Sequence, residues 1–178
     1  MKYIIGLGNP GSEYENNRHN IGFIVLDQLV DWLRIEGNFA YNKKFKADVL
    51  KSGDLVFIKP QDYMNNSGQV VRAVINFYEK SVNLNDVIVL HDDLDIVVGQ
   101  YKFQLGKGPK VHNGLLDLNK HLGGEDYWHA RIGVDNRRGD RSMPGSNYVL
   151  SNFNNIELDT IAEMSTTLFR EIKAEIDK

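Results

Sequence analysis

Short apolar runs alternate with amphipathic segments along most of this chain. Residues 21–33, for example, carry apolar side chains at positions 21, 25, 26, 29, 30 and 33, which is the spacing of one helix face. The predicted strands cover residues 3–7, 44–50, 55–58, 86–90, 99–105 and 128–134, and the predicted helices cover residues 21–33, 67–78, 112–122 and 156–176. This alternation predicts an α/β fold, a three-layer sandwich in which helices flank a mixed central β-sheet.

The whole chain, residues 1–178, is expected to form a single domain. Its length allows a substantial core, and no linker, repeat or low-complexity segment divides it. It contains no cysteine, which excludes disulfides, thiolate zinc sites and cysteine nucleophiles. The N-terminal apolar run is too short for a signal peptide or a membrane span, so we expect a soluble, uncleaved protein, and a reducing cytoplasm fits this composition.

The first twenty residues bring a strand, a tight turn and a helix start together. The strand at residues 3–7 runs into the turn that holds Asn9, and His19 and Asn20 directly precede the first predicted helix. Asn20 is a suitable N-cap. His19 would then lie just outside the helix N-terminus, where the helix dipole disfavours the imidazolium form and leaves a ring that can accept a proton. We therefore expect Asn9 and His19 to meet in one site.

Residues 6–11 also match the glycine pattern G-x-G-x-x-G of dinucleotide-binding folds. In that motif the last glycine opens a helix on the pyrophosphate, whereas residues 12–20 of this chain are almost uniformly polar. The acidic residue expected at the end of a second strand is also missing, because Asp27 falls inside the predicted helix. These differences argue against a nucleotide cofactor.

Three predicted helices begin at junctions rich in asparagine. The junctions are His19-Asn20, Asn65-Asn66 and His112-Asn113. A single asparagine at a helix start is usually a cap. Three of them, together with Asn9 and the strand end at His91, Asp92 and Asp93, are the components of a general-base hydrolase without a covalent nucleophile. In such a site a histidine activates water, a carboxylate orients the ring, and amides polarise a carbonyl group.

Motifs spread over nearly the whole chain resemble those of bacterial-type peptidyl-tRNA hydrolases. They lie, in order, at residues 6–11, Tyr14, and residues 18–23, 64–68, 91–95, 112–115, 131–133 and 148–153. The resemblance implies a cytoplasmic, monomeric esterase that cuts the bond between the C-terminal carboxyl of a peptide and the 3′ ribose of tRNA. It also implies that no metal or cofactor is required, so peptidyl-tRNA is the one expected partner.

The resemblance assigns roles to individual positions. His19 resembles the catalytic base and Asp92 its partner carboxylate; Asn9, Asn65 and Asn113 resemble the amides that hold the peptide end and the attacking water; Tyr14, Met64 and His112 match positions that line the cleft; and Arg131 matches a basic residue near the tRNA path. The choice of Asp92 over Asp93 or Asp95 rests on the resemblance alone.

Two departures from the family pattern concern tRNA. The loop before His112 is usually dense in glycine, whereas here Pro109, Lys110 and Val111 occupy part of it. Gln104 stands where the family often has a lysine that contacts tRNA. Lys107 and Lys110 are the nearest residues that could restore the missing charge, in a stretch (102–141) that carries eight basic and five acidic residues although the chain has a net charge of −3.

Two other functions remain open from the residues. The first is an RNA-binding module on the same fold that has lost hydrolysis, which the intact histidine, aspartate and asparagines disfavour. The second is a phosphoesterase with a metal held by His91, Asp92, Asp93 and Asp95, since oxygen ligands at this spacing could bind Mg²⁺. That alternative leaves the asparagine junctions unexplained.

Overall fold

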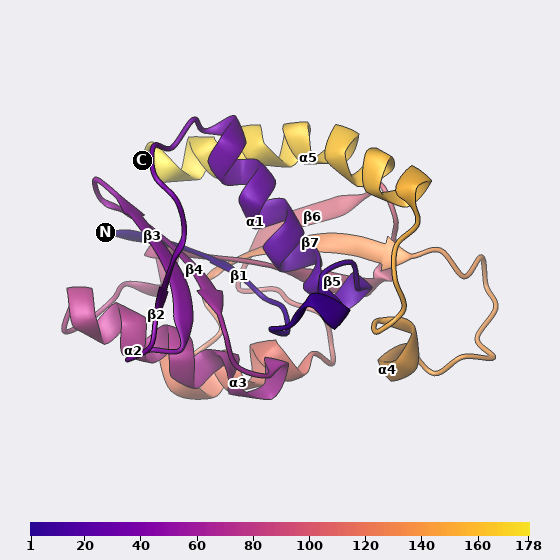
Figure 1. Cartoon of the computed structure of the whole chain (residues 1–178), viewed down its shortest axis with the longest axis horizontal. Helices are drawn as coiled ribbons and strands as arrows, with labels where there is room; N and C mark the ends of the chain where they lie inside the picture. The colour runs from indigo at the N-terminus through magenta and orange to yellow at the C-terminus, as the bar shows by residue number, and fades with distance from the viewer.

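A seven-stranded mixed sheet forms the centre of the molecule (Figure 1). The computed structural model describes all of residues 1–178. The strands are β1 (Lys2–Gly6), β2 (Ala40–Asn42), β3 (Ala47–Ser52), β4 (Leu55–Pro60), β5 (Val87–Val97), β6 (Tyr101–Leu105) and β7 (Trp128–Asp135), in the spatial order β2-β3-β4-β1-β5-β7-β6. β1 pairs in parallel with β4 and β5, and β5 with β7, while the other pairs are antiparallel. The predicted α/β fold with a mixed sheet is confirmed.

Helices cover both faces of this sheet. α1 (Ile21–Trp32) and α5 (Asn155–Ile176) lie on one face, and α2 (Ser67–Tyr78) and α3 (Asn113–Leu122) lie on the other (Figure 1). Side chains of β1 alternate between the two cores, with Tyr3 and Ile5 facing α2 and α3 and Ile4 facing α1 and α5. Shorter helical segments are η1 (Ser12–Tyr14), η2 (Arg18–Asn20), η3 (Met64–Asn66), η4 (Leu84–Asp86) and α4 (Gly145–Tyr148).

The start of α1 packs unusually close to the sheet. A Cβ atom on Gly22 would lie 2.4 Å from the carbonyl oxygen of Leu90 and 2.5 Å from the backbone nitrogen of Leu7. Only a glycine fits such an approach. The contact holds η2, which immediately precedes α1, against the ends of β1 and the middle of β5.

Three elements differ from the sequence prediction. β2 is a three-residue edge strand whose side chains are all exposed, so it has no apolar alternation to reveal it. α4 lies between the predicted strand at residues 128–134 and the predicted helix at residues 156–176, where no helix was expected. β5 was predicted to end at residue 90 but continues to Val97, because parallel pairing with β7 carries it past the polar residues His91, Asp92 and Asp93.

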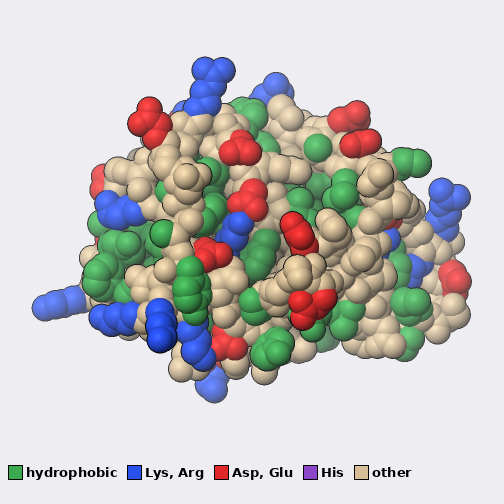
Figure 2. Space-filling model, in the orientation of Figure 1, with side chains coloured by type: hydrophobic (Ala, Val, Ile, Leu, Met, Phe, Trp, Pro, Cys, Tyr) green, Lys and Arg blue, Asp and Glu red, His purple; other side chains and the backbone are tan.

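Charged side chains are unevenly distributed over the face shown in Figure 2. Lys and Arg gather mainly around its rim, with a group at the lower left, while acidic side chains lie across its middle. No histidine is visible on this face. Three of the histidines, His91, His112 and His129, are buried.

Candidate active site

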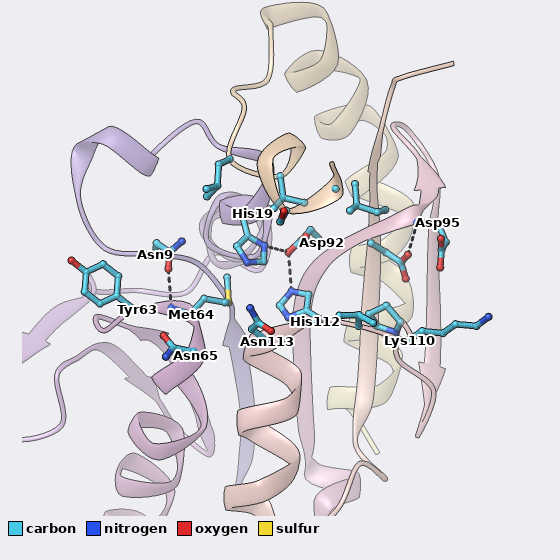
Figure 3. A pocket seen from close by; sticks show the side chains of 18 residues that line it. Asn9, His19, Tyr63, Met64, Asn65, Asp92, Asp95, Lys110, His112 and Asn113 are labelled. Atoms are coloured by element: carbon cyan, nitrogen blue, oxygen red, sulfur yellow. Dashed lines mark hydrogen bonds and ion pairs between the residues drawn. The ribbon is translucent and has the colours of Figure 1, made fainter. Parts of the chain in front are cut away.

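A cavity of about 820 Å³ lies where the loops that follow β1 and β4 meet β5 (Figure 3). Its lining residues are Asn9, His19, Tyr63, Met64, Asn65, Asp92, Asp93, Leu94, Asp95, Pro109, Lys110, Val111, His112, Asn113, Gly145, Ser146, Val149 and Leu150. Eight of the eleven residues that the sequence singled out are among them, so segments from five regions of the chain converge as expected.

The amide of Asn9 is fixed by two neighbours. Its Oδ1 accepts a hydrogen bond from the backbone N–H of Met64 at 2.8 Å (Figure 3). The side chain of Asn20 holds the Asn9 backbone from the other side, accepting from its N–H at 3.0 Å and donating to its carbonyl oxygen at 2.9 Å. Because Oδ1 is occupied as an acceptor, Asn9 presents Nδ2 to the cavity as a donor.

Asn20 occupies the N-cap position of α1, as predicted, but its side chain does not cap the helix. Its side chain makes no capping bond to the helix and is used entirely on Asn9. Asn20 is therefore a residue of the site that the sequence analysis placed in a purely local role. Its position beside His19 was visible in the sequence, but the long-range partner was not.

At the other two junctions, no asparagine side chain caps the helix, although Asn66 occupies the N-cap position of α2. At the start of α2, the Oδ2 atom of Asp117, on α3, accepts from the backbone N–H groups of Gly68 at 2.8 Å and Gln69 at 3.3 Å. At the start of α3 the cap is His112, whose Nδ1 accepts from the N–H of Leu115 at 3.3 Å. The side chains of Asn65 and Asn113 have no hydrogen-bond partner within the protein and line the cavity.

One carboxylate oxygen joins two histidines at the back of the cavity (Figure 3). Asp92 Oδ1 lies 2.8 Å from His19 Nδ1 and 2.9 Å from His112 Nε2. Burial would raise the pKa of Asp92, but the charges and hydrogen bonds of His19 and His112 outweigh burial and hold that pKa well below its usual range. The oxygen is therefore an acceptor, and both histidines donate to it.

These partners determine the tautomer of each ring. His112 donates from Nε2, so its Nδ1 is free to accept from Leu115, as observed. His19 donates from Nδ1, which is its only side-chain hydrogen bond within the protein and leaves its Nε2 as an acceptor without a partner there. His19 lines the cavity, so this acceptor is available to a bound molecule.

The electrostatic environment of His19 differs from the one the sequence suggested. The helix dipole was expected to disfavour its charged form. Burial does lower the pKa of His19, but the neighbouring Asp92 carboxylate raises it by more, so the pKa lies above the ordinary histidine value. A contact at 2.8 Å with a full negative charge outweighs the partial charge of a helix end.

The remaining acidic and histidine side chains of β5 have other partners. Asp93 accepts from Arg131 Nε at 2.8 Å, and His91 donates to the Asp92 carbonyl oxygen at 3.0 Å. Burial and the neighbouring imidazoles hold the pKa of His91 well below its usual range, and burial lowers the pKa of His129 to about 4. Among the three aspartates, only Asp92 contacts His19.

Known proteins match this chain over almost its full length. The peptidyl-tRNA hydrolase family model matches residues 3–178. The peptidyl-tRNA hydrolase of Aliarcobacter butzleri is 38% identical over 174 residues, which is 98% of this chain and 91% of the relative. That of Neisseria meningitidis is 44% identical over 147 residues, or 80% of this chain and 74% of the relative. The chain belongs to the peptidyl-tRNA hydrolase family.

The fold supports the same assignment, which confirms the resemblance of the motifs. The crystal structure of peptidyl-tRNA hydrolase from Acinetobacter baumannii superimposes with a TM-score of 0.87 at 29% identity, covering 99% of this chain and 89% of that one. Membership in the peptidyl-tRNA hydrolase family makes the chain an ester hydrolase. None of its helices combines the length and apolarity needed to cross a bilayer.

The metal cluster considered as an alternative does not form. Asp93 is paired with Arg131, and His91 is buried away from the cavity against His129. A different group, His19, Asp92 and His112, has its ligand atoms within 4.8 Å of one another. A metal on His112 Nε2 would require the ring proton on Nδ1, where it would face the N–H of Leu115, so the observed bonds favour the hydrogen-bonded arrangement.

The residues predicted for tRNA contact lie in different settings. Lys110 lines the main cavity and also a second hollow of about 250 Å³, whereas Lys107 lines only the second hollow. Arg131 is buried, and its guanidinium donates to Asp93 and to Gln104 Oε1 at 3.1 Å. Tyr14 lies in η1 and is not part of the cavity wall. The structure therefore does not bring Tyr14 or Arg131 into the site.

One wall of the cavity was missed by sequence reasoning. Gly145, Ser146, Val149 and Leu150 line it from α4 and the residues that follow. The segment was noted only as part of a family motif at residues 148–153. Its polar composition gives no periodic signal, and the contacts that join it to Arg18 and His19 span more than a hundred positions.

Proposed function

We propose that this peptidyl-tRNA hydrolase cuts the ester bond between a peptide's C-terminal carboxyl and the 3′ ribose oxygen of tRNA, with His19 as general base. One observation carries the proposal. The ring of His19 presents an unpartnered Nε2 acceptor to the cavity, while its Nδ1–H is held 2.8 Å from the ionised Asp92. A base held in the correct tautomer by a carboxylate is the arrangement that water activation requires.

The reaction proceeds in two proton transfers. His19 Nε2 takes a proton from a water molecule as the water oxygen attacks the ester carbonyl. Asp92 stabilises the imidazolium that forms. When the tetrahedral intermediate collapses, the bond to the ribose oxygen breaks, and that oxygen takes the proton from His19. The products are tRNA with a free 3′ hydroxyl and a peptide carboxylic acid, which loses its proton to solvent and becomes the carboxylate; the histidine returns to its starting state.

Amide groups hold the reacting carbonyl. Asn9 Nδ2 is oriented as a donor by the contact between its Oδ1 and Met64, and Asn65 and Asn113 offer side-chain amides without competing partners. Donors fixed in advance stabilise the negative charge that develops on the carbonyl oxygen, and a single such donor contributes about 10²–10³-fold to turnover. Met64 and His112 complete the wall around these groups.

Lysines in the loop before His112 supply charge for the tRNA. Lys107 and Lys110 are exposed and have no acidic partner within 4 Å. Each phosphate that they neutralise releases counterions and strengthens binding at low salt. Arg131 does not add to this charge in the proposal, because Asp93 already balances it.

All residues of the proposed site come from one chain, and every strand joins one sheet. We therefore infer that the protein acts as a monomer and that residues 1–178 form one domain. Neither the cavity nor the His19–Asp92 pair requires a second copy to be complete.

The test is incubation of the protein with labelled N-acetyl-aminoacyl-tRNA, with and without a chelator, followed by separation of free tRNA. We expect equal release of tRNA under both conditions and release about 10²–10⁴-fold slower from His19→Ala. Binding of the substrate without release would indicate an RNA-binding protein instead, and loss of release with chelator would indicate metal-dependent hydrolysis.

A further inference from the structure

The cavity wall formed by residues 145–151 is attached directly to the segment that carries His19. The backbone N–H of His19 donates to the carbonyl oxygen of Val149 at 2.8 Å, and that of Arg18 donates to Ser151 at 3.0 Å. Val149 and Leu150 line the cavity. The proposed base and this wall are thus neighbours joined by main-chain hydrogen bonds, although they are about 130 residues apart in sequence.

The side chain of Arg18 ties this junction together. Only 6% exposed, it donates from Nε to Ser151 Oγ at 3.1 Å and from one terminal nitrogen to the Val134 carbonyl oxygen at 3.1 Å. Its guanidinium carbon lies 4.5 Å from the ring centre of Tyr148 and 4.8 Å from that of Phe153. Both rings belong to the wall segment or its continuation, so the guanidinium is held between them.

Glu157 completes the arrangement from α5. Its carboxylate lies 2.9 Å from the second terminal nitrogen of Arg18 and also accepts from the side chain of Asn136 at 2.9 Å. Glu157 and Asn154 form a capping box at the start of α5. Burial would raise the pKa of Glu157, but its hydrogen bonds to Asn154, Asn136 and Arg18 lower it below the usual value. The pair is buried and charged, and each guanidinium nitrogen of Arg18 has a hydrogen-bond acceptor.

We propose that Arg18, paired with Glu157, is a positioning residue that keeps the 145–151 wall in register with His19 and so sets the distance between base, substrate and Asp92. This inference rests on the proposed role of His19. Arg18 itself points away from the reacting atoms, toward β7, the wall segment and α5. It acts through the main chain of the adjacent residue and through the two aromatic rings.

This role requires the guanidinium group of an arginine, whose three nitrogens donate to three different partners. A lysine at position 18 would keep the charge but offer a single point of attachment in place of three directions, and it would not stack between the rings in the same way. The main chain at residues 18 and 19 would then lose part of its support. A displacement of about 1 Å in a catalytic group is enough to lower turnover by about 10²-fold.

The experiment compares Arg18→Lys with the control Arg137→Lys. Arg137 stacks on the same Tyr148 ring at 4.7 Å and pairs with Asp135, but it does not contact residues 17–19. For both variants and wild type, kcat, KM, the pH profile of kcat and the melting temperature are measured on N-acetyl-aminoacyl-tRNA. Ser151→Ala is a milder variant in case Arg18→Lys does not fold. It removes the acceptor of Arg18 Nε together with the bond that the same hydroxyl donates to the Tyr148 carbonyl oxygen.

For Arg18→Lys we expect kcat to fall by about 10- to 100-fold, and its acid limb to move to lower pH. The titratable groups in contact with His19 are Asp92 and His112. If the distance between His19 and Asp92 increases, the carboxylate raises the pKa of His19 less, and the lowering by burial then outweighs it. Ser151→Ala should show a smaller change in the same direction, and Arg137→Lys should show neither effect. A loss of melting temperature with unchanged kcat and pH profile would overturn the inference, whereas an inactive wild type would overturn the proposed function.

Discussion

The His19 end of the cavity and the loop at residues 106–111 differ in how firmly their side chains are held. His19, Asp92 and Asn9 are buried or nearly so, and each is fixed by hydrogen bonds to elements far away in sequence. In the loop, no backbone–backbone hydrogen bond involves residues 107–111, and Val111 is 80% exposed. The loop lysines have no ion-pair partner.

This difference follows from what each region is proposed to do. Proton transfer requires a base within about 3 Å of a specific proton, so the groups that perform it need fixed positions. Attraction of phosphates acts over several ångströms in water and depends on the number of charges more than on their exact arrangement. One cavity can therefore combine a rigid end, formed by His19, Asp92 and Asn9, with an open end, formed by the loop at residues 106–111.

The strongest test of the rigid end is His19→Ala. Loss of the general base should lower kcat by about 10²–10⁴-fold, while tRNA affinity stays close to wild type because phosphates dominate that affinity. Single-turnover hydrolysis and filter binding measure the two quantities separately. A variant with near wild-type turnover would remove His19 from this role and with it the contrast between the two ends.

Asp92→Asn should cause the next largest loss and should also move the pH profile. The Asp92 carboxylate raises the pKa of His19 above the ordinary value of 6.5, and only the neutral ring accepts a proton, so wild-type kcat should fall as pH decreases through a value above 6.5. Without the carboxylate, burial alone lowers this pKa, and the acid limb should shift to lower pH. Asp95→Asn is the comparison, with a smaller loss and no shift; the reverse order would identify a different partner carboxylate.

Asn20→Ala tests whether the rigid end depends on the two hydrogen bonds between the Asn20 side chain and the Asn9 backbone. Removing both hydrogen bonds should leave buried backbone groups unpaired, which costs about 1–3 kcal/mol of stability, and should lower kcat even at temperatures well below unfolding. Asn66→Ala is a suitable control, because its side chain contacts only Asp62 near the surface, at 3.2 Å. Equal effects of the two variants on kcat would argue against a role for the hydrogen bonds between Asn20 and Asn9.

Lys107→Ala/Lys110→Ala tests the open end and should have the smallest effect on chemistry. Affinity for tRNA should drop, and the slope of log affinity against log salt should shrink by roughly one to two. Hydrolysis of a small N-acyl amino-acid ester without tRNA should stay at the wild-type rate. An unchanged salt slope would place the tRNA path away from this loop and would leave the loop without its proposed function.

The order of strands and helices was largely predictable, because most elements have strong apolar periodicity. The helices at residues 21–33 and 156–176 and the strand at residues 128–134 were found within a residue or two of their ends. The errors fall where periodicity is absent or where tertiary pairing decides. β5 continues through His91 and Asp93 only because β7 lies beside it, which no local pattern reveals.

Residue types in the site were easier to predict than their partners. His19, Asn9, Asn65 and Asn113 could be chosen from their places at a strand end and at helix starts, and the structure brings them into one cavity. The partnership of His19 with Asp92, the raised pKa of His19, and the internal pairing of Arg131 depend on contacts between distant segments. These pairings and the raised pKa could not be predicted from the charge and spacing of residues in the sequence.

The cap supplied by Asp117 affects how the family can vary at this cavity. Asp117, on α3, accepts hydrogen bonds from the first N–H groups of α2, so the side chains of Asn65 and Asn66 are not needed to cap that helix. A substitution at Asn65, which lines the cavity, therefore changes what the cavity wall offers to a substrate with little cost in folding. Helix integrity and substrate preference are assigned to separate residues, which leaves this part of the enzyme free to diverge during evolution without first acquiring a compensating mutation.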